Sequence, residues 1–182
     1  YASLPDKYSC MPLINVIIPA FNEEKSIQKV IRDIPANWVQ DIIVVDNNST
    51  DNTFAAAQAA GSTVLKEPRQ GYGQACLTGI AYALNKPANQ QPDVIVFLDG
   101  DYSDHPEELP QVVQPILENK ADLVIGSRAL GNRQKGAMTP QQIFGNWLAT
   151  TLLKYLYGVH FTDLGPFRAI RTDKLVQLGM TD

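Results

Sequence analysis

The chain is poor in the residues that build disulfide frameworks and soft-metal sites. Its 182 residues include two cysteines and two histidines. Cys10 and Cys76 do not form a metal-ligand spacing, and two cysteines are too few to staple a chain of this size. A disulfide-rich secreted domain is therefore excluded, and a cytoplasmic location is expected.

Positive charge is also scarce, because 15 lysines and arginines face 19 aspartates and glutamates, for a net charge of −4. This balance argues against a nucleic-acid-binding protein. The hydrophobic fraction of 45% is ordinary for a soluble globule, and the length suits one core. We expect a single domain over residues 1–182. Tyr1 is not an initiator Met and the chain stops soon after a strand-like segment, which leaves open a C-terminally truncated fragment of a longer protein.

No segment is apolar enough to indicate a membrane span with certainty. The most apolar stretch, residues 141–157, is interrupted by Asn146 and Lys154. One interpretation is a helix that packs on the core or forms a homodimer contact. The other is a surface helix in peripheral contact with the inner face of a membrane, where Trp147 and Tyr155 would suit the interface.

Two common nucleotide-binding signatures are missing. Gln70 to Gly73 carries two glycines, Gly71 and Gly73, before a segment of small residues, which resembles part of a phosphate-cradling loop. The full dinucleotide fingerprint is absent, and no Gly-Lys-Ser/Thr follows. We therefore exclude NAD binding and ATP hydrolysis, and keep both glycines as candidate phosphate contacts. Arg69 beside them is either a phosphate ligand or a solvated charge.

What the sequence does contain is a regular alternation of strand and helix patterns. Apolar runs predict strands over residues 13–18, 42–45, 62–65, 93–98 and 123–126. We expect Pro19 to end the first strand and Asn22 to cap the helix after it. A later helix opens at Pro106, and Pro115 should kink or shorten it. The alternation predicts an α/β fold, a mostly parallel sheet with helices on both faces.

The most informative segment is the buried strand that ends in two acids. Five apolar residues, 94–98, are followed by Asp99, Gly100 and Asp101. Charges that arrive where a buried parallel strand stops lie at its carboxyl edge, which is where open α/β sheets bind ligands. Carboxylate oxygens suit Mg²⁺ or Mn²⁺, and such an ion holds substrate phosphates. Gly100 would let the backbone approach a phosphate or would simply allow a tight turn.

Two further strands end in polar clusters, residues 19–23 and 46–51. Because parallel strands end at one edge, these clusters should converge with Asp99 and Asp101 on a single ligand. The alternative is that Asn22 and Asp51 only cap helices and that Asp46 only closes a turn.

Taken together, these motifs resemble the family 2 inverting glycosyltransferases. The resemblance rests on residues 16–23, 44–53, 71–75 and 98–101, with further support from residues 104–107, 126–128 and 163–168 in the same order. The likeness is to the dolichyl-phosphate mannose/glucose synthase-like branch, and it runs from about residue 14 to residue 172.

The resemblance implies a GT-A (Rossmann-like) fold that binds a nucleoside diphosphate sugar with Mg²⁺ or Mn²⁺. The residues it places at the nucleobase and ribose are Pro19, Ala20, Asn22, Glu23 and Asp46. It places Asp99 and Asp101 on the metal ion that holds the diphosphate.

The expected reaction is transfer of a hexose from UDP-glucose or GDP-mannose to a polyprenyl phosphate. Arg128 would clamp the acceptor phosphate, or else would form an ion pair. Asp163 would serve as a general base for a hydroxyl acceptor, would position the acceptor or the sugar, or would cap a turn. The alternatives are transfer to a saccharide or small-molecule hydroxyl, and a non-catalytic nucleotide-sugar-binding module.

Overall fold

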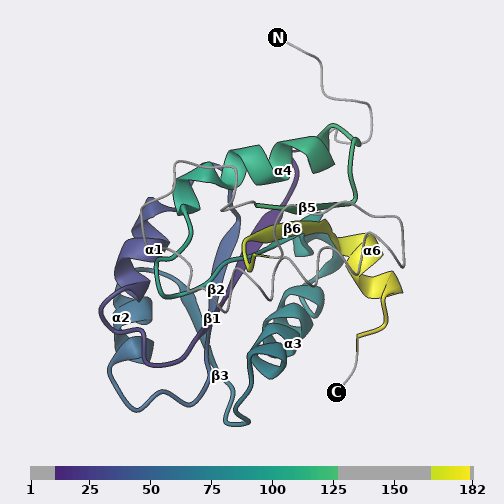
Figure 1. Ribbon diagram of the computed structural model, residues 1–182. Helices are drawn as coiled ribbons and strands as arrows, with labels where there is room; N and C mark the ends of the chain where they lie inside the picture. Colours follow the sequence, from purple (N-terminus) through teal and green to yellow (C-terminus); the bar gives the residue numbers. More distant parts are fainter. Residues whose placement is uncertain (1–10, 127–164, 181–182) are drawn as a thin grey trace, which may run out of the picture.

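The computed structural model describes residues 11–126 and 165–180, which form a twisted sheet covered by helices (Figure 1). Six strands lie in the order β3-β2-β1-β4-β6-β5. The strands are β1 (Ile14–Ala20), β2 (Asp41–Asp46), β3 (Thr63–Lys66), β4 (Val94–Phe97), β5 (Leu123–Ile125) and β6 (Arg168–Arg171). The helices are α1 (Ile27–Asp33), α2 (Thr53–Ala59), α3 (Tyr72–Leu84), α4 (Leu109–Leu117) and α6 (Thr172–Gln177), with single 3-10 turns at η1 (Ala88–Gln90) and η2 (Pro106–Glu108).

The half of the sheet built from β3, β2, β1 and β4 is parallel. β6 runs antiparallel to both β4 and β5. β1 and β4 are buried along their whole length, as expected for strands covered on both faces. The predicted mostly parallel α/β sheet is confirmed, and its carboxyl edge gathers the ends of β1, β2 and β4.

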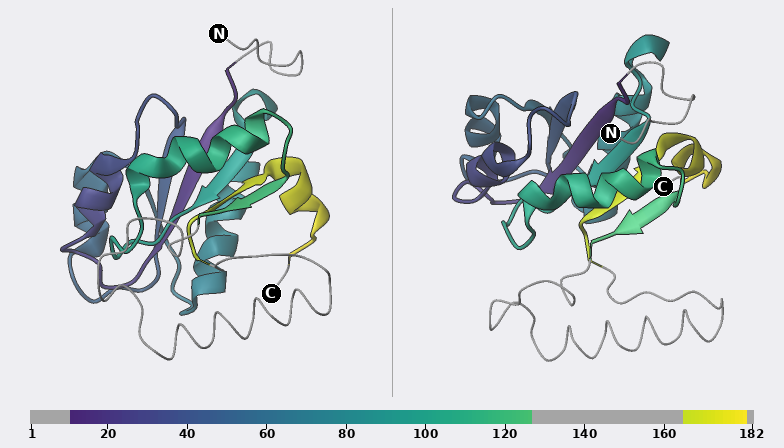
Figure 2. Two further views of the ribbon diagram at one scale, coloured as in Figure 1. Left: turned by 45° about the horizontal axis from the view of Figure 1, so that its top comes forward. Right: turned by 90° about the horizontal axis from the view of Figure 1, so that it is seen from above.

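Side chains alternate between two apolar layers, one on each face of the sheet. Figure 2 shows the helices that pack around the sheet. Val16 and Ile18 of β1 point into the layer that also holds buried residues of α1, α2 and α4. Ile17 points into the opposite layer, with buried residues of α3 and α6. The helices therefore cover both faces, in agreement with the sequence pattern.

The prediction that Pro19 ends the first strand was wrong by one residue. Pro19 lies inside β1 and pairs in register with Val45 of β2. The pairing of β1 with β4 covers only Ile14 to Ile17, so Pro19 lies beyond it. Successive strand residues alternate their hydrogen-bonding sides, and the Ile17 carbonyl faces β4 while the Ala20 carbonyl faces the β2 side. The missing N–H of Pro19 therefore points where no ladder partner is required.

The predicted helix cap at Asn22 was also wrong, because α1 starts later, after Ser26. Asn22 has a positive φ of 58° and gives its side chain to another loop. The helix expected from Pro106 does begin there as η2, and α4 follows. Pro115 lies inside α4, which ends two residues later. Within the described ranges, no helix has both the length and the apolar character that crossing a membrane requires.

Candidate functional site

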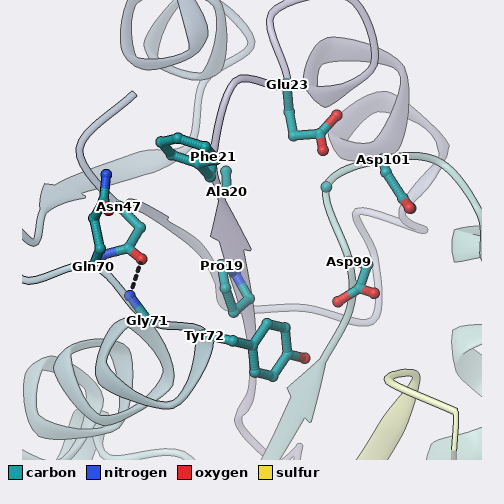
Figure 3. A pocket seen from close by; sticks show the side chains of 11 residues that line it. Pro19, Ala20, Phe21, Glu23, Asn47, Gln70, Gly71, Tyr72, Asp99 and Asp101 are labelled. Atoms are coloured by element: carbon teal, nitrogen blue, oxygen red, sulfur yellow. Dashed lines mark hydrogen bonds between the residues drawn. The ribbon is translucent and has the colours of Figure 1, made fainter. Parts of the chain in front are cut away.

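A cavity of about 370 Å³ opens at the carboxyl edge of the sheet, where β1, β2 and β4 end. It is lined by Pro19, Ala20, Phe21, Glu23, Asn47, Gln70, Gly71, Tyr72, Asp99, Gly100 and Asp101. Figure 3 shows the carboxylates of Asp99 and Asp101 on one side and Asn47 with Gly71 on the other, with Pro19 and Tyr72 between them. Residues as far apart in sequence as Pro19 and Asp101 thus meet around one space, as the strand-edge argument predicts.

The loops after β1 and β2 are joined by direct hydrogen bonds. The Asn22 side-chain oxygen accepts from the Thr50 backbone N–H at 2.8 Å, and the Asn22 N–H donates to the Ser49 hydroxyl at 3.0 Å. Asp51 accepts from the Glu24 N–H at 3.2 Å, and its other oxygen accepts from the Thr53 N–H. Asn22 and Asp51 therefore fasten the loops to each other, and neither lines the cavity.

Asn47 ties the wall opposite the acids together. Its backbone N–H donates to the Ala20 carbonyl at 2.8 Å, at the end of β1. Its amide nitrogen donates to the carbonyls of Glu67 and Arg69, and its amide oxygen accepts from the Gly71 N–H at 2.7 Å. One buried side chain thus sets the path of the loop that leads into α3.

Glu67 supports the same loop from within. Its carboxylate accepts hydrogen bonds from the Thr78 hydroxyl at 2.6 Å and from the Arg69 backbone N–H at 2.9 Å. These hydrogen bonds, with the Arg69 guanidinium beside them, lower the pKa of Glu67 to about 2. The Arg69 side chain is exposed, pairs with Glu67 at 3.3 Å and is absent from the cavity lining, so the structure favours the solvated charge over the phosphate ligand.

Asp99 and Asp101 form a donor set that fits a hard divalent ion. Both carboxylates face the cavity from the end of β4, on either side of the buried Gly100. In the described part of the chain, no cluster of three or more metal-ligating side chains occurs. Two carboxylates suffice for Mg²⁺ or Mn²⁺ when a diphosphate and water supply the remaining oxygens. The residues present therefore fit such an ion bound together with a nucleotide.

Gly100 packs tightly without needing to be a glycine. A Cβ built on it would lie 3.4 Å from the Glu23 side chain and 3.5 Å from Ile27, which are ordinary contacts. Its φ is not in the positive region. Gly100 does lie in a turn, as one interpretation predicted, but the turn does not require glycine, and the close approach of Gly100 to a ligand stays a prediction.

Tyr72 separates this cavity from a second one of about 480 Å³. Burial and the nearby charge of Asp99 raise the pKa of the Tyr72 phenol, while a hydrogen bond with Arg168 acts in the opposite direction. The second cavity is lined by Tyr72, Gly73, Cys76, Leu77, Phe97, Leu123, Ile125, Arg168, Ile170, Leu175, Leu178 and Met180. Arg168 is the one charged residue on that lining among the described residues.

The structure places the predicted site residues as follows. Pro19, Ala20, Glu23, Gly71, Asp99, Gly100 and Asp101 share the first cavity. Asp46 is buried and accepts the Ser49 N–H at 3.3 Å, so it shapes the turn and does not line the cavity. Gly73 lines the second cavity instead. Arg128, Asp163 and the segment 141–157 lie outside the described residues.

Sequence reasoning did not single out Asn47, Glu67 or Tyr72. Asn47 stood in a polar cluster whose members could not be ranked from composition. Tyr72 lies between Gly71 and Gly73, and the glycine pattern predicts a phosphate-binding loop without giving the tyrosine a role. Nothing near Glu67 in the sequence indicates that its side chain is buried.

Comparison with known proteins places the chain among glycosyltransferases. The family model described as glycosyl transferase family 2 matches residues 15–179. An uncharacterized glycosyltransferase of Mycobacterium tuberculosis is 33% identical over 171 residues, which cover 93% of this chain and 72% of that protein. A UDP-N-acetylglucosamine–dolichyl-phosphate N-acetylglucosaminyltransferase of Methanococcus voltae is 28% identical, over 83% of this chain and 66% of that protein.

Among solved structures, glucosyl-3-phosphoglycerate synthase from Mycobacterium tuberculosis, in complex with Mn²⁺, uridine-diphosphate-glucose and phosphoglyceric acid, superposes with a TM-score of 0.68 at 28% identity. The match covers 89% of this chain and 57% of that one, so the chain spans little more than half of the solved protein. The fold is the GT-A fold that the sequence resemblance implies. The chain belongs to glycosyl transferase family 2.

Proposed function

We propose that this chain is the donor-binding and catalytic domain of a metal-dependent inverting hexosyltransferase. The donor is a nucleoside diphosphate sugar, UDP-glucose or GDP-mannose, and the acceptor is a polyprenyl phosphate. The observation that carries the proposal is that Asp99 and Asp101 face Asn47 and Gly71 across one cavity at the carboxyl edge of the sheet. That arrangement suits a diphosphate held between a cation and the N-terminus of α3, which begins beside Gly71.

The nucleoside end of the donor is assigned to the wall formed by the ends of β1 and β2. Pro19, Ala20 and Glu23 line the cavity and would contact the base and ribose directly. Asn22 and Asp46 would act indirectly, by holding the loops that carry those contacts. The phosphates would lie toward Gly71 and Gly100.

Asp99 and Asp101 would hold the ion, Mg²⁺ or Mn²⁺, beside the diphosphate. When bound, the ion supplies positive charge that neutralises the departing nucleoside diphosphate. The carboxylates fix the position of the diphosphate relative to the sugar, so that the acceptor oxygen approaches from the opposite face. Such preorganised charge contributes most to catalysis when it meets charge that develops in the transition state.

The apolar second cavity supports a lipid-linked anion as acceptor. It adjoins the donor cavity through Tyr72, its lining is dominated by apolar side chains, and Arg168 is placed to meet a phosphate. We assign Arg128 as a second phosphate contact, and Asp163 as the residue that positions the acceptor. A lipid phosphate is already an anion, so Asp163 need not take a proton from it.

The Methanococcus relative, whose name specifies a dolichyl-phosphate acceptor, supports this choice. The glucosyl-3-phosphoglycerate synthase complex favours a second candidate, transfer to the hydroxyl of a small phosphorylated acid, in which Asp163 would be the general base. The polyprenyl acceptor would place the enzyme in the cytoplasm, in peripheral contact with the inner face of a membrane.

The test is transfer of radiolabelled hexose from UDP-glucose or GDP-mannose, with Mn²⁺ or Mg²⁺, to farnesyl phosphate and to 3-phosphoglycerate in parallel. We expect label in the lipid product only. Asp101→Asn should lower that transfer on the order of 100-fold, because the charge of the leaving group is no longer neutralised. Arg128→Ala should abolish it by removing the phosphate clamp.

Glu118→Gln serves as the control, because it removes one negative charge at the end of α4, away from the cavity. It should transfer label as the parent protein does. Label in glycosylated 3-phosphoglycerate would replace the lipid acceptor with the second candidate. Binding of the donor without transfer to any acceptor would contradict the enzymatic proposal.

A further inference from the structure

The loop that carries Asp99 and Asp101 continues into a tyrosine with an unusual backbone. Tyr102 has a φ of 64°, in the left-handed region that bulky side chains rarely adopt. Glycine and asparagine enter that region readily, but the residue at this position is a tyrosine. Surrounding contacts must therefore hold Tyr102 in place.

Those contacts come from α1. The Tyr102 hydroxyl donates to the Asp33 carboxylate, and the Lys29 ammonium lies 3.7 Å from the centre of the Tyr102 ring. Lys29 and Asp33 are four residues apart and therefore lie on the same face of the helix. The half-buried ring also packs against the apolar layer beneath α1. Helix α1 thus contacts both the ring face and the hydroxyl group of this side chain.

Asp101 is fixed from both sides as a result. On its N-terminal side, the buried Gly100 lies close to the side chains of Glu23, in the loop before α1, and of Ile27, at the start of α1. On its C-terminal side stands the gripped Tyr102, and the Ser103 N–H donates to one Asp101 oxygen at 2.8 Å. The Asp101 side chain itself is exposed toward the cavity. The direction of Asp101 is therefore set by its hydrogen bond from Ser103 and by the neighbouring residue Tyr102, which α1 holds in place.

We propose that Tyr102 is a positioning residue for the divalent ion: Lys29 and Asp33 hold its ring and hydroxyl, and this fixes the Asp101 carboxylate toward the diphosphate. The inference rests on the proposed function, since it assumes the ion at Asp99 and Asp101. Among the described residues, Asp99 and Asp101 are the two carboxylates assigned to the ion, so the site depends on having them oriented before the ion arrives. Groups that orient metal ligands commonly change metal affinity 10- to 100-fold, on the order of magnitude expected here.

The test measures Mn²⁺ binding by electron paramagnetic resonance of the free ion, with UDP or GDP present, and the binding of the nucleotide without metal by calorimetry. Tyr102→Phe keeps the ring and removes the hydroxyl, and Asp33→Asn weakens the acceptor. We expect each to lower Mn²⁺ affinity about 10-fold while nucleotide binding without metal stays unchanged. The double variant should bind Mn²⁺ no more weakly than Tyr102→Phe alone, because both substitutions act on the same hydrogen bond.

Tyr82→Phe is the matched control, because Tyr82 also lies under a lysine, with Lys86 5.4 Å from its ring centre, but belongs to α3. It should bind Mn²⁺ as the parent protein does. Parental Mn²⁺ affinity in Tyr102→Phe and Asp33→Asn, together with loss of binding in Asp101→Asn, would overturn the positioning role and leave the metal site standing. A parent protein that binds nucleotide but no Mn²⁺ would overturn the metal site, and this inference with it.

Discussion

At the scale of single residues, Glu67 shows how a buried carboxylate organises the wall of the donor cavity without touching the ligand. It accepts from Thr78 and from the Arg69 backbone, and it stands beside Asn47, which bonds to the Glu67 carbonyl. Its ionised form is favoured by these donors, so the pKa falls from the ordinary 4.5 to about 2.

This shift makes stability depend on acid. A carboxyl group whose pKa is lower in the folded state than in the unfolded state stabilises the fold at pH values above the unfolded pKa, here 4.5. That contribution is lost as the pH falls toward the folded-state pKa of about 2. Glu67→Gln should therefore be less stable than the parent at pH 7, and the two should converge between about pH 4.5 and 2. Urea unfolding at several pH values measures this, with the exposed Glu108→Gln as control. Parallel profiles for parent and Glu67→Gln would contradict the assignment.

Asp99 and Asp101 could be found from the sequence, because two acids that directly follow a buried parallel strand lie at the carboxyl edge of the sheet. Asn22 could not be assigned in the same way. A polar residue after a strand is equally suited to cap a helix or to bond a neighbouring loop, and here it bonds Thr50. Glu67 and Tyr102 carry no local signal at all, since their partners Thr78 and Asp33 are 11 and 69 residues away.

At the scale of elements, the close approach of α3 to β1 depends on a glycine. A Cβ on Gly79 would lie 2.6 Å from the Ile17 side chain, too near for any real contact. α3 begins at Tyr72, so this packing also sets the wall between the two cavities.

Gly79→Ala should therefore destabilise the protein by roughly 1–3 kcal/mol, as overpacked cores do. Gly73→Ala, in the same helix but with open space around its Cβ, should be neutral or stabilising by up to about 1 kcal/mol. Denaturant midpoints compare the two directly. Equal stability of both variants would show that α3 can shift away from β1 at little cost.

The elements themselves were predictable where the pattern was strong. The runs at 42–45 and 94–98 gave β2 and β4 within one residue. For β6 the sequence indicated no more than a strand-like segment near the end of the chain, without bounds, because Arg168 and Arg171 flank only two apolar residues. Its burial comes from pairing with β4 and β5, which are distant in sequence, and no local pattern reports such pairing.

At the scale of the whole molecule, the residues that would meet the donor lie at one edge of the sheet and the opposite edge is structural. There Lys86 pairs with Asp41 at 2.6 Å, and Asp93 accepts the Leu13 N–H. The division follows from the parallel order of β3, β2, β1 and β4.

Binding of UDP or GDP with Mn²⁺ should therefore slow amide hydrogen exchange at the carboxyl edge alone. We expect added protection over residues 19–23, 47–50, 69–73 and 99–103, because ligand binding stabilises the closed form of these loops. Residues 13–14, 41–42 and 85–93 should exchange as before. Protection spread evenly over both edges would instead indicate global stabilisation without a localised site.

The place of β6 in the sheet has a consequence for how the protein is made. Among the described strands, β5 joins the sheet through β6 alone, and the residues of β6 come some forty positions later in the chain. During synthesis, the edge of β4 that pairs with β6 stays unpaired until Arg171 has left the ribosome. The parallel strands β3, β2, β1 and β4 can already assemble by then. We expect the apolar cavity, which Arg168 and Ile170 help to close, to be the last part of the described structure to form.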